Sequence, residues 1–145
     1  MTRILPFIAL ALLLGCSSAD DVPGYKKQSG DLGVFILQQS SKFGARAQQT
    51  NGLPQFTANW RYKEESNGFE IYLAGDHFAQ LQSFLTAAFG PPAIPPKTRE
   101  LAGTKNIATH YDPAKLGAFL HYGSQTTGDG KQSTSMVVLS AYATK

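Results

Sequence analysis

Two histidines and one aspartate in the C-terminal part of the chain are the residues whose types and spacing come closest to a chemical site. His110 and Asp112 share a face of one predicted strand by parity, and His121 lies on the next predicted strand. If these strands form a hairpin with Tyr111 opposite Ala118, His110 and His121 are diagonal neighbours within roughly 8 Å. Two imidazoles and a carboxylate are ligands that Zn or Fe can use. One hypothesis is therefore a small hydrolase or metal-dependent protein that uses these three residues.

The same residues also fit a purely structural role, and we favour that interpretation. A hairpin has a polar face, and Asp112 directly precedes Pro113, as a cap precedes the first residue of a helix. The chain contains no G-x-S-x-G, H-E-x-x-H, P-loop or G-x-G-x-x-G motif. We therefore predict that the protein is not an enzyme and has no catalytic residue and no metal site.

Cys16 is the only cysteine of the chain, and an apolar segment precedes it. Arg3 is followed by an 11-residue run, 4–14, that only Pro6 interrupts. This run is shorter than the about 20 residues that span a bilayer. A short apolar run after a positive charge is typical of a secretory signal peptide. A single cysteine has no internal disulfide partner, and a free thiol is unfavourable in an oxidising compartment. We therefore expect the thiol of Cys16 to be modified in another way.

The ending Leu13-Leu14-Gly15-Cys16 resembles the lipobox of bacterial lipoprotein precursors. The resemblance implies a diacylglycerol on the sulfur of Cys16, cleavage between Gly15 and Cys16, and acylation of the new amino group. This covalent lipid is the only added group that we expect, and no cofactor is predicted. Each buried methylene stabilises membrane attachment by about 0.8 kcal/mol, so several chains on one residue hold it firmly. An ordinary signal peptide followed by a chance cysteine is the alternative.

Ser17, directly after the cysteine, bears on location. In the lipoprotein sorting systems that the resemblance brings with it, Asp at this place retains the protein at the inner membrane and Ser permits export. We expect a lipid anchor in the outer membrane with the domain facing the periplasm, and the inner membrane and the cell surface are the alternatives. The expected partners are the membrane, through the N-terminal lipid, and another envelope protein.

The net charge and the length of the chain limit the functional classes and the number of domains that are possible. Removal of residues 1–15 takes away Arg3 and leaves 130 residues with 12 Lys or Arg against 10 Asp or Glu, a net charge of +2. A balance this close to neutral gives no reason to expect nucleic acid as a partner. The polar stretch 16–31 predicts a lipidated cysteine on a flexible tether, and 32–145 predicts one globular domain.

Hydrophobic patterns predict an α+β domain, namely an antiparallel sheet of about five or six strands with one main helix, 76–89, packed on one face. The expected strands are 32–39, 56–63, 69–73, 107–111, 118–122 and 134–143, the last in the interior of the sheet. The expected connections are a loop 40–55 with a helical turn near 45–49, an extended proline-rich segment 91–96, a helical turn at 112–117 and a mobile loop 123–133.

The hairpin between 56–63 and 69–73 allows two registers that keep the apolar faces together. A two-residue turn at Asn67-Gly68 would place Glu65 opposite Glu70, and like charges directly opposed are unfavourable. A four-residue loop, 65–68, places Lys63 opposite Glu70 and Tyr62 opposite Ile71. We predict the second register.

The main helix has clear end signals. Asp76 is the expected cap, and Gly90 with Pro91 ends the helix. Its apolar stripe contains Phe78, Leu81, Leu85 and Ala88, and we expect Trp60 of the preceding hairpin to face it. The other side carries no formal charge. That side is either an Ala-rich solvated surface, which we favour, or a docking surface. It consists of His77, Ala79, Gln80, Ser83, Thr86 and Ala87.

Three functional hypotheses follow. We favour a non-enzymatic envelope lipoprotein that binds another protein. The second hypothesis is the hydrolase or metal-dependent protein using His110, Asp112 and His121. The third is a carrier of an apolar ligand held between helix and sheet.

The first testable prediction concerns acylation. A Cys16→Ser precursor should remain uncleaved or become soluble, because the substituted residue lacks the sulfur that carries the diacylglycerol. Radiolabelled palmitate uptake and membrane fractionation measure both effects. Normal processing with membrane retention in the variant would refute the lipobox.

Overall fold

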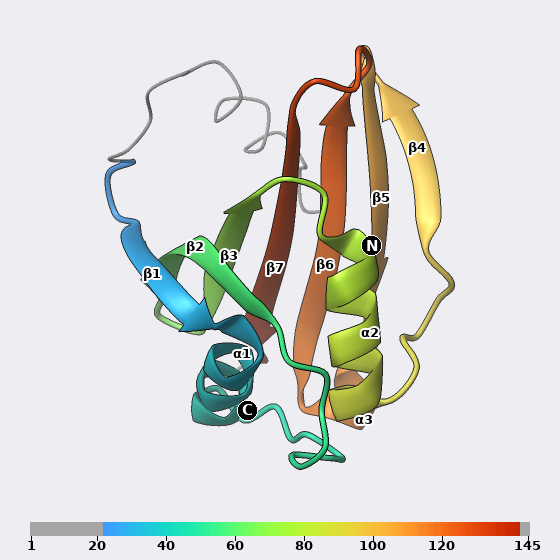
Figure 1. The fold of residues 1–145 in the computed structure, drawn as a ribbon. Coiled ribbons are helices and arrows are strands. Elements are labelled where there is room, and N and C mark those ends of the chain that lie inside the picture. Colours follow the sequence, from blue (N-terminus) through green and yellow to red (C-terminus); the bar gives the residue numbers. More distant parts are fainter. Residues whose placement is uncertain (1–21, 143–145) are drawn as a thin grey trace.

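Seven strands and three helices make up residues 22–142, the part of the chain that the computed structural model describes (Figure 1). Their order along the chain is β1 (Lys26–Asp31), α1 (Leu32–Lys42), β2 (Thr57–Glu65), β3 (Gly68–Ala74), α2 (Phe78–Phe89), β4 (Lys97–Leu101), β5 (Thr104–His110), α3 (Pro113–Leu116), β6 (Ala118–Thr127) and β7 (Ser133–Ala141). The α+β class is confirmed, with more strands and helices than predicted.

All seven strands belong to one antiparallel sheet with the order β1-β2-β3-β7-β6-β5-β4. The last strand of the sequence, β7, is therefore the central strand, which confirms its predicted interior position. It pairs with β3 along one side, where Ile71 lies opposite Val137. It pairs with β6 along the other, where Leu120 lies opposite Leu139.

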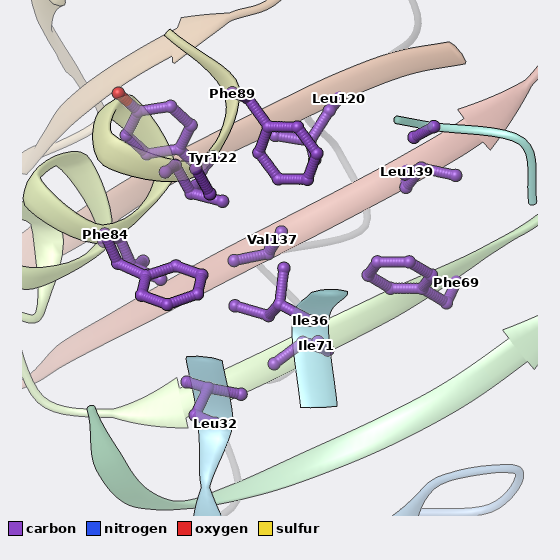
Figure 2. Close-up of a cluster of buried hydrophobic side chains, with 14 of the residues drawn as sticks. Leu32, Ile36, Phe69, Ile71, Phe84, Phe89, Leu120, Tyr122, Val137 and Leu139 are labelled. Carbon is purple, nitrogen blue, oxygen red and sulfur yellow. The ribbon is translucent and has the colours of Figure 1, made fainter. Parts of the chain in front are cut away.

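Helices α1 and α2 lie on the same face of this sheet (Figure 1). Side chains from both helices converge on the central strands to form one hydrophobic cluster (Figure 2). Leu32 and Ile36 of α1 are fully buried there, as are Leu81 and Leu85 of α2. The cluster's other labelled members in Figure 2 are Phe69, Ile71, Phe84, Phe89, Leu120, Tyr122, Val137 and Leu139.

The predicted register of the β2–β3 hairpin is confirmed. Lys63 lies opposite Glu70 and Tyr62 opposite Ile71. The turn is tighter than predicted, because Glu65 and Gly68 still pair and only Ser66 and Asn67 form the turn. Opposite charges on the pair Lys63 and Glu70 thus identified the register even though the loop length was wrong.

The predicted strand at 32–39 is wrong, because this segment is the start of helix α1. Asp31 caps the helix, and its carboxylate accepts a hydrogen bond from the Val34 amide at 3.1 Å. The consecutive apolar residues suggested a strand, but the buried ones, Leu32 and Ile36, are one helical turn apart. Val34 lies on the outer side and is 49% exposed.

The predicted tether is also too long. Residues 26–31 form the edge strand β1, in which Lys27 pairs with Arg61. Tyr25, just before it, donates a hydrogen bond from its hydroxyl to Glu70 and packs edge-on against Tyr72 at 5.7 Å between ring centroids. The polar composition of β1 is typical of a linker, because an edge strand of this kind buries little apolar surface and needs few hydrophobic residues.

The predicted helical turn at 45–49 does not form. Beyond α1 the chain is irregular and runs to the C-terminal end of α2, where the amides of Gln48 and Gln49 donate to the Ala88 carbonyl at 2.7 and 3.2 Å. Ala45 is buried. These tertiary hydrogen bonds take the place of the local ones that a helical turn would make.

The C-terminal half contains more strand than predicted. Strand β4, all of it exposed, was not expected, and most of the predicted mobile loop 123–133 belongs to β6 and β7. The remaining turn is closed by hydrogen bonds between Thr127 and Gln132. The Ser and Thr residues of this segment led to the prediction of a loop. Threonine is β-branched, however, and is common in half-buried strands.

Helix α2 agrees closely with its prediction, with two corrections. The cap position is His77 rather than Asp76, although the Asp76 carboxylate still accepts a hydrogen bond from the Phe78 amide at 3.1 Å. Trp60, which was expected to face the α2 stripe, packs its ring against Phe35 of α1, with ring centroids 5.1 Å apart. The unpredicted helix α1 thus supplies the cover for β2.

The two helices meet at Gly33. A Cβ atom at this position would collide with the ring of Phe84 in α2. Phe84 is 2% exposed, so its ring has little room to retreat. Glycine therefore allows α1 and α2 to share one face of the sheet.

The packing of α2 gives a stability prediction. Leu81→Ala should lower the free energy of unfolding by about 2–5 kcal/mol, because Leu81 is fully buried and the smaller side chain leaves a cavity. Leu101→Ala in β4 is the matched control, since Leu101 is 71% exposed and should cost under about 0.5 kcal/mol. Urea unfolding of both variants measures the difference, and equal effects would show that α2 does not pack on the sheet.

Candidate functional site

His110 and His121 do come together, and more closely than predicted. They lie directly opposite each other on β5 and β6. The predicted pairing of Tyr111 with Ala118 is wrong by two residues, because it would place Ile107 opposite Tyr122, whereas Thr109 lies there. The two imidazoles are therefore cross-strand neighbours instead of diagonal ones.

Phe119 lies beside both histidines. Its ring centroid is 5.3 Å from that of His110 and 6.3 Å from that of His121, and the second pair is stacked with an interplanar angle of 8°. Phe119 thus packs beside both imidazoles on one face of the sheet. The arrangement offers two nitrogen ligands at most.

Asp112 does not join the two histidines. Its carboxylate accepts a hydrogen bond from the Ala114 amide at 2.9 Å and caps the short helix α3, as the sequence Asp112-Pro113 predicted. Within residues 22–142 no group of three His, Cys, Asp or Glu side chains is placed to hold a metal ion. The predicted three-residue constellation is therefore reduced to a histidine pair.

The surroundings of His121 change the pKa of its imidazole. Burial, and secondarily the charge of His110, lower the pKa of His121 to about 4. The imidazole of His121 is thus neutral near pH 7, which suits its place between Phe119 and the neighbouring strand.

The space between α2 and the sheet is filled by side chains. Phe78 stacks on Tyr122 with ring centroids 5.5 Å apart, and Tyr111 packs against the other side of Tyr122 at 6.2 Å. Tyr111 also donates to the Gly90 carbonyl at the end of α2 at 3.0 Å. An apolar ligand between helix and sheet would have to displace these rings.

The predicted lipid attachment residue Cys16 and the preceding Gly15 lie outside the residues that the structure describes. The structure does show where the chain enters the domain, which is at Tyr25. Tyr25 contacts Glu70 and Tyr72, and the ammonium group of Lys63 lies 5.8 Å from the centre of its ring. Burial and the hydrogen bond to Glu70 raise the pKa of the Tyr25 phenol, which therefore stays neutral.

These contacts lie on the face of the sheet opposite α1 and α2, which we call the second face. Successive side chains of a strand point to opposite faces of the sheet. Trp60 and Tyr62 are buried beneath the helices, so Arg61 between them points to the second face. One row of the second face crosses all seven strands in the order Lys27, Arg61, Tyr72, Met136, Gly123, Ala108 and Lys97.

Sequence patterns did not reveal this face. The sequence holds one indication of it: Lys97 and Arg99 are two residues apart in β4, and Arg61 and Lys63 are two residues apart in β2, so each pair shares a face of its strand. Only the strand order and register show that these four cations belong to one surface.

Comparison with known proteins found no similar one: no family model matches the chain, and searches of curated proteins and of solved structures gave no significant match. None of the helices between residues 22 and 142 has the length and hydrophobicity to cross a bilayer.

The perturbed histidine gives a pH prediction. Because the pKa of His121 falls from 6.5 to about 4 on folding, the unfolded chain binds a proton between these values that the folded chain does not. Stability should therefore be complete above pH 6.5 and decrease as the pH falls toward 4, by up to about 3 kcal/mol. Urea unfolding at pH 7 and pH 5 measures the decrease.

The matched variants are His121→Gln and His110→Gln. The first removes the titrating group and should flatten the curve between pH 7 and pH 5. The second should keep most of the slope, because burial is the larger cause of the shift. An unchanged slope in His121→Gln would contradict the assignment.

Proposed function

We propose that this protein is a bacterial envelope lipoprotein, held in the outer membrane by a lipid on Cys16, whose domain binds another envelope protein without catalysing a reaction. The lipobox-like segment supports the anchor. The domain itself supports the binding role, because it has a rigid core and an accessible helix surface.

The observation that carries the binding role is the outer face of α2, which this proposal assigns to docking rather than to the solvated surface that its composition favoured. Ala79, Gln80 and Ser83 are exposed on it, and the helix has no acidic residue in its first turn and no basic residue in its last. An uncharged surface loses little hydration when a partner covers it. Since the stripe on the opposite side is fixed to the sheet, this face is presented rigidly, and rigid presentation lowers the entropy cost of binding.

A site-specific photo-cross-linker tests this role. Placed at Gln80 of the lipidated protein in intact membranes, it should give a discrete cross-linked product, whereas the same group at Lys131, on the β6–β7 turn, should not. The product at Gln80 should disappear when Ser83 is changed to Glu, because the new carboxylate would be desolvated in the interface. The same product in the Ser83→Glu variant, or an equal yield at Lys131, would rule out α2 as the binding face.

A further inference from the structure

The chain enters the domain on the second face. Tyr25 is held there by its hydrogen bond to Glu70 and its contact with Tyr72. Five residues, 17–21, separate Cys16 from Val22, where the described structure begins. At no more than about 3.6 Å per residue, Cys16 and Val22 are at most about 22 Å apart. A lipid on Cys16 therefore keeps this face within a short distance of the bilayer.

The second face also carries the net charge of the domain. Five cations point from it, together with two carboxylates, Glu65 and Glu70. The cations are Lys27, Arg61, Lys63, Lys97 and Arg99. The rest of residues 22–142 carries six Lys or Arg and six Asp or Glu, including Asp31, which is turned toward α1 as its cap. All of the excess positive charge in this part of the chain thus lies on one surface.

The two carboxylates of the second face already have partners. Glu65 forms an ion pair with Lys63 at 2.5 Å, and Glu70 accepts the hydrogen bond from Tyr25. Lys97 and Arg99, both exposed, stand at the opposite edge of the sheet on β4. Because neighbouring strands are about 4.8 Å apart, the row from Lys27 to Lys97 extends about 29 Å.

Apolar side chains occupy the middle of the second face. Tyr72, Met136 and Val138 are half-buried there, and Phe119 lies beside the histidine pair. No helix within the described residues covers them (Figure 1). Cations at both edges and apolar groups between them match an interface of anionic headgroups over acyl chains.

We propose that the second face lies on the surface of an anionic bilayer, so that the domain rests flat on the membrane with α1 and α2 pointing away from it. The proposal rests on the proposed lipid attachment at Cys16. Lys97 and Arg99 contact phosphate groups, and Lys27 and Arg61 add to the positive potential of the face. The lipid anchor supplies the second attachment that a weak electrostatic contact needs. The outer face of α2 is then free for a protein partner.

Lysine labelling of the lipidated protein in vesicles tests this orientation. A membrane-impermeant amine reagent is applied in vesicles of phosphatidylcholine alone and in vesicles with added phosphatidylglycerol, and the modified lysines are quantified by mass spectrometry. Labelling of Lys97 should fall several-fold in the anionic vesicles, while Lys115 and Lys131 should be labelled equally in both. High salt should restore the labelling of Lys97, because it screens the headgroup charge. Lys97 is the informative probe, since it lies at the edge farthest from the anchored segment.

Paired charge reversals provide the control. Lys27→Glu with Arg99→Glu should abolish the protection of Lys97, whereas Lys115→Glu with Lys131→Glu, which changes the net charge equally, should keep it. All four side chains are exposed, so both variants should fold, and circular dichroism verifies this. Loss of protection in both variants would contradict a role specific to the second face.

The remaining outcomes separate the two proposals. A protein that fails to stay with any vesicle lacks the lipid, and the proposed anchor is then wrong. A protein that stays with both vesicle types but shows equal labelling of Lys97 refutes the flat orientation alone. Protection of Lys97 in native membranes but not in anionic vesicles also refutes it, and assigns the second face to a protein.

Discussion

The pairing of β7 with both β3 and β6 is the interaction on which the rest of this structure depends. Val137 and Leu139 of β7 are buried under the helices, between residues of β3 on one side and of β6 on the other. Strand β7 thereby joins the half of the sheet formed before α2 to the half formed after it. Since the β3–β7 contacts join distant parts of the sequence, loop-closure entropy opposes them until the shared core forms. The burial of both helices on the β7 face offsets that cost.

Placing both helices on one face has consequences for the other. The two helices are in close contact, and Gly33 allows this by leaving room for the ring of Phe84. The second face keeps its own side chains, half-buried by neighbours and rich in cations at the edges. The two surfaces that we propose follow from this asymmetry. On one side α2 packs on the sheet and exposes its uncharged outer face, and the other side is the one that we propose to lie on a membrane.

The histidine pair shows why residue types alone are a weak guide to chemistry. His110 and His121 are adjacent, but the carboxylate of the third candidate ligand, Asp112, accepts a hydrogen bond from the Ala114 amide in α3. The ring of Phe119 lies beside both imidazoles, and the lowered pKa of His121 keeps that imidazole neutral near pH 7. Such a pair contributes to pH-dependent stability whether or not it has any further role.

The sequence by itself determined the features that depend on neighbours along the chain. The α+β class, the position of α2, the cap at Asp112 and the β2–β3 register all follow from short-range patterns, and for the register from the charges of Lys63 and Glu70. Tertiary structure alone decided the features that depend on distant partners. Residues 32–39 are helical, which buries Leu32 and Ile36 and sets Phe35 against Trp60 of β2. Strands β1 and β4 form because they extend the sheet, although their own residues bury little. The grouping of Lys27, Arg61, Lys97 and Arg99 on one face likewise requires the strand order, because alternation along a strand fixes a side chain's face only once its neighbours are known.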